Sequence, residues 1–207
     1  MAKLNGSFSG ISTSKVYPYV SYSSTQNSAT NTSSVTVTLV FKSISAYYGF
    51  GTCSGTDLYC GGTINKGSIA FDVAANGSDT ITSTTQTIYH NADGAGSAKV
   101  GANGSTNISW GSFDFSTTYV LPNITRAAAV TTTAASSVGQ TSATVGGNVT
   151  DTGLPRCTKG IVWGTTSGSY PNTIGLGTAT TTGAYTTNIT GLTAGTTYYY
   201  KAYGTNS

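Results

Sequence analysis

The sequence predicts an all-β protein built of two β-sandwich domains. Of its 207 residues, 27 are Ser and 40 are Thr, and they are accompanied by 27 Gly and 14 Tyr. Thr, Tyr and the β-branched residues favour strands, whereas Gly, Ser and Asn favour the turns between strands. The chain has no Glu and only seven Leu, so the residues that usually build helices are scarce. Almost no helix is therefore expected.

Period-two alternation of apolar residues supports several strands in the first half of the chain. In the segment SSVTVTLVFKS the apolar side chains all fall on one face: Val35, Val37, Leu39 and Phe41. GSIAFDVAANG repeats the pattern, and in VYPYVSYSS the residue Pro18 indicates an edge strand or a bulge because Pro cannot donate a ladder hydrogen bond. Strands near residues 80–90 and 96–103 and a last strand through ISWGSFDFSTTYVL complete this half.

The stretch TIYHNADGAGSAKV holds the only His of the chain and one of its six Asp residues. Two interpretations compete for it: a catalytic or metal-binding loop, and a plain turn. Asn91, Asp93 and Gly94 are turn formers, since Asx side chains bond to nearby backbone and Gly accepts positive φ. We therefore expect a turn between two strands, with His90 ending the first strand and taking no part in catalysis.

A change of composition after Leu121 indicates the end of the first domain. PNITRAAAVTTTAASSVGQ is poor in large apolar residues and prone to turns, and we place the boundary near Arg126. The predicted domains are residues 1–126 and 127–207. Four short strands with turn signals between them then follow, as in a sandwich: TSATVGGNVTDTG, TKGIVWGTT, GAYTTNITGL and TTYYYKAYGTNS.

Three segments carry a resemblance that spans roughly residues 128–207. They are TSATVGGNVTDTG, KGIVWGTTSG and TTNITGLTAGTTYYYKAYGTNS, the last containing an L-x-x-G-T-x-Y pattern at Leu192, Gly195, Thr196 and Tyr198. In this order they resemble the fibronectin type III and immunoglobulin-like modules of bacterial and phage surfaces. The resemblance implies a tyrosine corner, in which the Tyr198 hydroxyl bonds to upstream backbone. It bears on fold and not on ligand.

Four motifs follow one another over residues 4–127: NGSFSG, YPYVSYSSTQNSATNTSSVTVTLVFK, HNADGAGSAKV and LPNITRA. In that order they resemble a family of siphophage tail structural proteins whose N-terminal β domain has no assigned function. The linker departs from the family pattern, because Asn123, Ile124 and Thr125 intervene between Pro122 and Arg126. The resemblance implies a virion component, in the tail or another external appendage, that presents surface to the host.

Charge and hydropathy exclude several classes of protein. The net charge is +3 and the nine Lys and Arg residues are scattered singly, whereas a nucleic-acid surface would cluster them. No apolar run approaches the roughly 18 residues of a membrane span, and the N-terminus lacks the apolar core of a signal peptide. We therefore expect no nucleic-acid partner, no membrane insertion and no export by the general secretion route.

The three cysteines, Cys53, Cys60 and Cys157, do not make a disulfide framework. Free thiols in a reducing cytoplasm are favoured, and the alternative is a Cys53–Cys60 bond across a hairpin. A zinc site would need further ligands, and the single His is not at ligand spacing from these residues. No metal and no cofactor are expected.

Catalysis has no candidate residues. Glycan hydrolysis needs two carboxylates facing the scissile bond. Of the six Asp residues, four lie in or beside evident turns, while Asp72 and Asp114 are expected at solvent-facing strand positions. Nucleophilic catalysis lacks a base, since the one His has no G-x-S-x-G motif near it. No Gly-rich segment is followed by the Lys-Ser or Lys-Thr of a phosphate loop. We expect a protein that is not an enzyme.

Glycan binding is favoured by the tyrosines of the first 60 residues. A Tyr ring offers an apolar platform to a sugar face, and its hydroxyl offers a hydrogen bond. The alternative for each Tyr is packing in the core or across strands. The candidate contact residues are Tyr17, Tyr19, Tyr47 and Tyr48, and AYYGFG is the segment that we most expect to be exposed.

These observations favour a non-enzymatic bacteriophage structural protein that is assembled in the host cytoplasm and resides in the virion. Its expected partners are other virion proteins, further copies of itself and a glycan of the host cell surface. The first sandwich, jelly-roll-like or immunoglobulin-like, would serve assembly or host contact, and the second would be a displayed module. The alternative is a bacterial surface adhesin or a carbohydrate-binding module of a larger secreted protein.

The fibronectin type III-like module is expected to lack its last strand. The segment YYYKAYGTNS occupies the place of the penultimate strand, and the sequence stops at Ser207. Residues 197–204 would then have an unpaired edge, open to another strand. Two explanations compete: the natural chain continues, which we favour, or a neighbouring subunit supplies the strand. Near Tyr200, backbone hydrogen bonds to the strand containing Val162 should occur on one side only.

Overall fold

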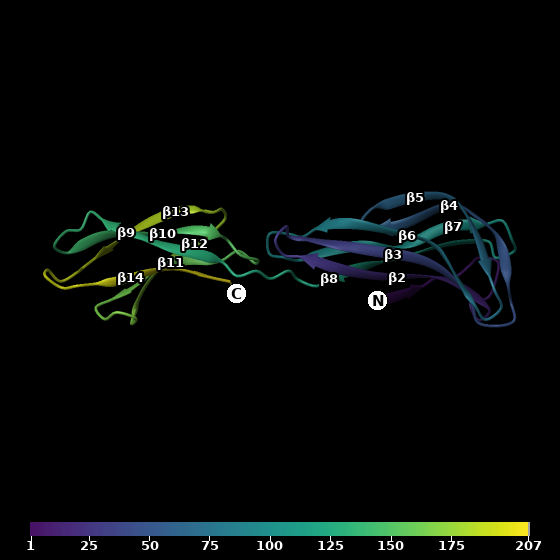
Figure 1. The fold of residues 1–207 in the computed structure, drawn as a ribbon, viewed down its shortest axis with the longest axis horizontal. Helices are drawn as coiled ribbons and strands as arrows, with labels where there is room; N and C mark the ends of the chain where they lie inside the picture. Colours follow the sequence, from purple (N-terminus) through teal and green to yellow (C-terminus); the bar gives the residue numbers. More distant parts are fainter. Residues whose placement is uncertain (207) are drawn as a thin grey trace. The chain divides into compact units, whose positions relative to one another are not determined.

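The computed structural model describes residues 1–206 and contains fourteen β-strands (Figure 1). None of the described residues is helical, so none belongs to a helix that could cross a membrane. The chain divides into two compact units: unit 1 comprises Met1–Asn91 and Ala95–Asn123, and unit 2 comprises Ala92–Gly94 and the residues from Ile124 onward. The prediction of an all-β protein made of two sandwiches is confirmed.

Unit 1 is a sandwich of two four-stranded antiparallel sheets, with strand orders β1-β2-β3-β6 and β5-β4-β7-β8. The strands are β1 (Ala2–Asn5), β2 (Val16–Asn27), β3 (Thr32–Ser43), β4 (Gly49–Cys60), β5 (Thr63–Val73), β6 (Ser78–Tyr89), β7 (Gly96–Thr106) and β8 (Ser112–Leu121). β6 and β7 belong to different sheets, so the segment between them connects the two layers instead of closing a hairpin.

The core of unit 1 lies between its two sheets. As predicted, β3 buries its alternate apolar residues completely: Val35, Val37, Leu39 and Phe41. Phe41 contacts Phe8 and Phe71 edge to face, with ring centroids 5.0 and 5.2 Å apart. Phe71 in turn stacks on Trp110 at 5.5 Å. Each such side chain contributes about 1.5–3 kcal/mol by burial, so this aromatic cluster fixes the sheets against each other.

Pro18 does not mark an edge strand or a bulge, contrary to the sequence prediction. β2 lies between β1 and β3, and its pairing with β3 has no register shift. Pro18 is tolerated because β1 ends at Asn5, which pairs with Tyr19, so the ladder on that side stops just before Pro18. Its carbonyl still accepts a hydrogen bond from the Gly6 N–H at 2.8 Å. The missing N–H of Pro18 therefore falls where no ladder bond is needed.

The segment after β6 is a turn, as predicted. The Asn91 N–H donates to the Ala95 carbonyl at 2.7 Å, and Gly94 has φ +85°, a conformation that suits Gly. His90 follows β6 directly and is buried, with its Nε2 2.8 Å from the Ser33 hydroxyl. That His90 takes no part in catalysis stays a prediction.

The cysteines are free and buried. Cys53 and Cys60 lie in the same strand, β4, so the alternative of a bond across a hairpin is wrong. At about 3.3 Å per residue their Cα atoms are roughly 20 Å apart, whereas a disulfide needs less than about 7 Å. Burial raises the pKa of both thiols, which keeps them protonated and unreactive.

Unit 2 is a sandwich of two three-stranded sheets, with orders β13-β10-β9 and β12-β11-β14. Its strands are β9 (Ala129–Ser136), β10 (Ser142–Asp151), β11 (Thr158–Gly164), β12 (Asn172–Thr178), β13 (Gly183–Thr190) and β14 (Tyr199–Thr205). The facing side chains form a second core that is separate from that of unit 1 and centres on Val145, Ile161 and Ile189.

Two strands of unit 2, β9 and β12, were not predicted from the sequence. Residues 129–136 were expected to be a turn-prone linker, yet they form β9. Ala and Thr dominate this segment and leave no apolar alternation, so its strand conformation comes from pairing with β10. β12 contains two Gly within seven residues, which hides its pattern, although Ile174 and Leu176 pack on the core.

The tyrosine corner and the unpaired edge are both present. The Thr193 N–H donates to the Tyr198 hydroxyl at 3.1 Å, which ties the strand start to the backbone upstream. β14 pairs with β11, with Val162 opposite Lys201 and Trp163 opposite Tyr200. Among residues 1–206 no strand pairs with the other side of β14, so the prediction of hydrogen bonds on one side only is confirmed.

Candidate glycan-contact surface

Tyr17 and Tyr19 lie on the outer face of the β1-β2-β3-β6 sheet. Alternation along β2 buries Val16, Pro18 and Val20 against the core, so the two tyrosines between them point outward. Both are half-buried, and their ring centroids are 6.1 Å apart. They therefore form a short row of rings on the sheet surface instead of part of the core.

Tyr47 and Tyr48 lie in the connection between β3 and β4. Tyr47 is 41% exposed and Tyr48 is 70% exposed. The Ser43 hydroxyl donates to the carbonyls of Ser45 and Tyr47, which holds this connection against the end of β3. The prediction that the AYYGFG segment would be exposed agrees with these values, apart from the buried Gly49 and the half-buried Gly51.

Gly49 anchors the exposed loop to the core. A Cβ at this position would lie 2.4 Å from Cζ2 of Trp110, so only Gly lets the backbone approach the buried indole so closely. The side chains on either side of Gly49 consequently point away from the core. One of them, Phe50, is 70% exposed. It was not among the candidate contact residues, although it lies in the AYYGFG segment, two positions after Tyr48.

Lysine ammonium groups lie over two of the tyrosine rings. Lys3 Nζ is 4.8 Å from the centroid of the Tyr19 ring, and Lys15 Nζ is 4.4 Å from that of Tyr47. Lys15 also donates a hydrogen bond to the Tyr47 hydroxyl. Because Lys15 directly precedes β2, it connects the exposed loop to the strand that carries Tyr17 and Tyr19. We name Lys3, Lys15, Tyr17, Tyr19, Tyr47 and Tyr48 the tyrosine surface.

An open hollow of about 390 Å³ lies beside Tyr17. Asn5, Gly6 and Thr13 complete its lining, so an aromatic ring lies next to an amide and a hydroxyl. This combination suits a sugar, whose faces contact rings and whose hydroxyls exchange hydrogen bonds with polar side chains. The structure thus places Tyr17 beside Asn5 and Thr13, with Tyr19 next to Tyr17. Lys15, which precedes the strand carrying these two tyrosines, contacts Tyr47.

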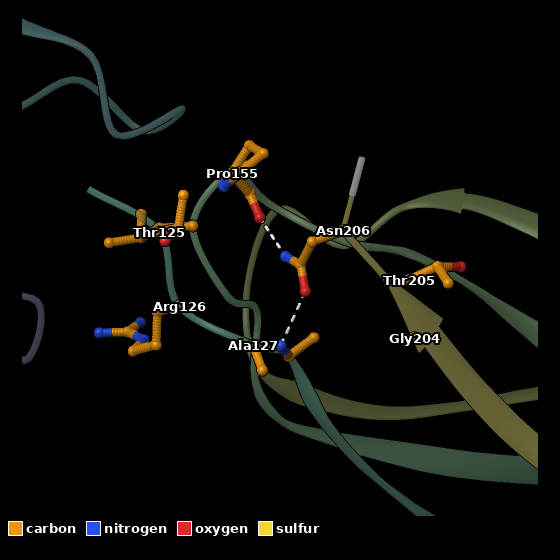
Figure 2. Close-up of a pocket in the computed structure, with 9 residues that line it drawn as sticks. Thr125, Arg126, Ala127, Pro155, Gly204, Thr205 and Asn206 are labelled. Atoms are coloured by element: carbon orange, nitrogen blue, oxygen red, sulfur yellow. Dashed lines mark hydrogen bonds between the residues drawn. The ribbon is translucent and has the colours of Figure 1, made fainter. Parts of the chain in front are cut away.

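A second hollow, of about 410 Å³, lies in unit 2 (Figure 2). The Arg126 guanidinium pairs with Asp151 at 2.8 Å. The Asn206 side chain accepts from the Ala128 N–H at 2.8 Å and donates to the Pro155 carbonyl, as the dashed lines in Figure 2 show. The Asn206 contacts fasten the end of β14 to the start of β9, so this lining has a structural explanation.

Two carboxylates of unit 1, those of Asp57 and Asp79, accept local hydrogen bonds. Asp57 accepts from the Asn65 side chain at 2.9 Å, and Asp79 accepts from the Asp72 N–H at 2.8 Å. Asp72 and Asp114 are exposed on their strands, as predicted. Within residues 1–206 no three His, Cys, Asp or Glu side chains gather as metal ligands.

Comparison with protein-family models, with curated proteins and with solved structures found no match for this chain.

Proposed function

We propose that this chain is a non-enzymatic structural component of a bacteriophage virion, in the tail or another external appendage, and that it contacts host-surface glycans through the tyrosine surface. The observations that carry the glycan contact are the exposure of Tyr47 and Tyr48 and the hollow that Tyr17 lines with Asn5 and Thr13. The proposal of a virion location rests on the ordered motifs of residues 4–127 that resemble siphophage tail proteins.

The physical basis of glycan contact is the rigidity of the rings. Gly49 over Trp110 and the Ser43 hydrogen bonds hold the loop, so little conformational entropy is lost when a sugar stacks on Tyr48. The exposed Tyr48 ring is in contact with water in the free protein, and covering it with the apolar face of a sugar is favourable. The two sandwich units act in this proposal as a scaffold that displays the surface.

Replacement of Tyr48 by Ala tests the glycan contact. On a glycan array, Y48A should weaken binding by about 1–3 kcal/mol, as for other aromatic contact residues, with little change in melting temperature. Tyr89→Ala is the matched control, since Tyr89 is a similarly exposed Tyr (79% against 70% for Tyr48) at the end of β6 and outside the tyrosine surface. Equal losses in Y48A and Y89A, or a large fall in stability with unchanged binding, would contradict the proposal.

Labelling of particles tests the virion location. Antibodies against the chain should decorate one appendage of the phage in negative-stain images. The alternative function, a bacterial adhesin or a carbohydrate-binding module of a larger secreted protein, predicts label on the bacterial surface and none on particles. Both functions share the tyrosine surface, so this experiment separates them while the glycan array does not.

A further inference from the structure

The tyrosine surface carries positive charge that no carboxylate neutralises. Lys3 and Lys15 lie over tyrosine rings, and Lys42 lies opposite Tyr17 in the β2–β3 register. Lys42 Nζ is 3.4 Å from the Asn76 carbonyl. Within residues 1–206 none of these three lysines forms an ion pair. Their ammonium groups are positioned by π faces and a carbonyl, which leaves the charge uncompensated.

The carboxylates of unit 1 lie elsewhere. Asp57 and Asp114 belong to β4 and β8 in the other sheet, and Asp72 belongs to β5 in that sheet too. Asp79 is in β6, but its carboxylate accepts from the Asp72 N–H and is directed toward β5. The outer face around Tyr17 and Tyr19 therefore has a positive local potential, although the net charge of the whole chain is only +3.

We propose that the tyrosine surface binds anionic glycans, meaning sugars that bear carboxylate or phosphate groups. This inference rests on the glycan contact proposed above and specifies its ligand class. A neutral sugar needs only the rings and the polar lining of the hollow. The additional ammonium groups of Lys3 and Lys15, over the rings of Tyr19 and Tyr47, select a ligand with negative charge. A Lys over an exposed ring keeps further N–H donors, and its contact with the ring is weak enough to redirect toward an anion.

The test measures binding of the full chain to three polymers: polygalacturonic acid, poly(glycerol phosphate) and neutral dextran. Both anionic polymers, or one of them, should bind more tightly than dextran, and the binding should weaken as NaCl is raised from low to physiological concentration. Preference for one anionic polymer identifies carboxylate or phosphate as the recognised group, and either result supports the proposal.

Two variants locate the charge effect. In K3Q/K15Q the affinity for the anionic polymer should fall roughly tenfold, since an exposed charge pair contributes up to about a fivefold factor for each lysine. K66Q/K201Q is the matched control, because it also removes two charges, one from β5 in the other sheet and one from β14 in unit 2. Melting temperatures of both variants should remain near that of the unaltered chain.

Three outcomes would overturn the inference in distinguishable ways. Equal binding of dextran and the anionic polymers, unaffected by K3Q/K15Q but reduced by Y48A, would leave glycan contact standing and remove the anionic preference. Equal weakening by K66Q/K201Q and K3Q/K15Q would show nonspecific attraction to a basic protein. Absence of binding to all three polymers and to every sugar on the array would remove the proposed glycan contact itself.

Discussion

At the scale of single residues, Gly49 decides where its neighbours point. Its backbone lies directly against the indole of Trp110, and Tyr48 and Phe50 are exposed on either side. A side chain at this position would push the loop away from the aromatic cluster. The exposed rings therefore depend on a residue that has no side chain of its own.

We expect Gly49→Ala to destabilise the protein by about 1–3 kcal/mol, because the added methyl overpacks against Trp110. Gly62→Ala is the control: a Cβ there meets no heavy atom within 4 Å, so its effect should stay within about 0.5 kcal/mol. Denaturant unfolding measures both free energies. Equal stability of the two variants would contradict the close contact between Gly49 and Trp110.

His90 is a structural residue in our interpretation. It is buried and hydrogen-bonded to Ser33, so His90→Asn should lower the free energy of unfolding by about 1–3 kcal/mol through the altered buried contacts. Glycan binding per folded molecule should not change. Calorimetric melting and binding titrations on the same preparation check this, and lost binding in a fully folded variant would show a functional role.

At the scale of elements, β14 has two unlike edges. One edge pairs with β11, while the Ala202 N–H on the other edge donates to the Thr132 hydroxyl at 3.0 Å. Because backbone groups alternate in direction along a strand, the amides of Tyr200 and Gly204 point to the same side as that of Ala202. β9 thus covers part of this edge by a side-chain contact instead of by a strand ladder.

Amide hydrogen exchange should reveal the difference between the two edges of β14. We expect Lys201 and Tyr203 to exchange slowly, since their amides face β11, and Tyr200 and Gly204 to exchange quickly. In Thr132→Val the Ala202 amide should exchange faster than in the unaltered chain, while Lys201 stays protected. Uniformly slow exchange along β14 would show that another strand pairs with its outer edge.

At the scale of the whole molecule, stability rests on two separate hydrophobic cores and not on covalent links. The three cysteines are buried and free, and burial raises the pKa of the Cys53 and Cys60 thiols. Addition of a reducing agent should leave the melting temperature unchanged. Alkylation at about pH 8 should be slow in the folded protein and fast in denaturant, because the reactive thiolate is disfavoured in the buried site. A melting temperature lowered by reductant would contradict this account.

Local pattern was sufficient for much of the fold. Strict alternation at Val35, Val37 and Leu39 predicts which face of β3 is buried, because successive side chains of a strand point to opposite sides. The resemblance of the L-x-x-G-T-x-Y segment to fibronectin type III and immunoglobulin-like modules implies the tyrosine corner, whose hydroxyl needs only a backbone group five residues upstream. These features depend on residues that are near one another in the chain, so the sequence by itself determined them.

Tertiary structure decided the features that depend on distant partners. β9 is a strand because β10 lies beside it, Pro18 is tolerated because β1 ends at Asn5, and Cys53 cannot meet Cys60 because one strand holds both. In the same way the Tyr residues could be chosen as candidates from the sequence, but the lysines over their rings could not. The ammonium groups of Lys3 and Lys15 reach those rings only after strand pairing brings residues 16 and 32 positions apart into contact. Side-chain neighbours across a sheet are set by register and by packing of the two layers, and no local pattern encodes them.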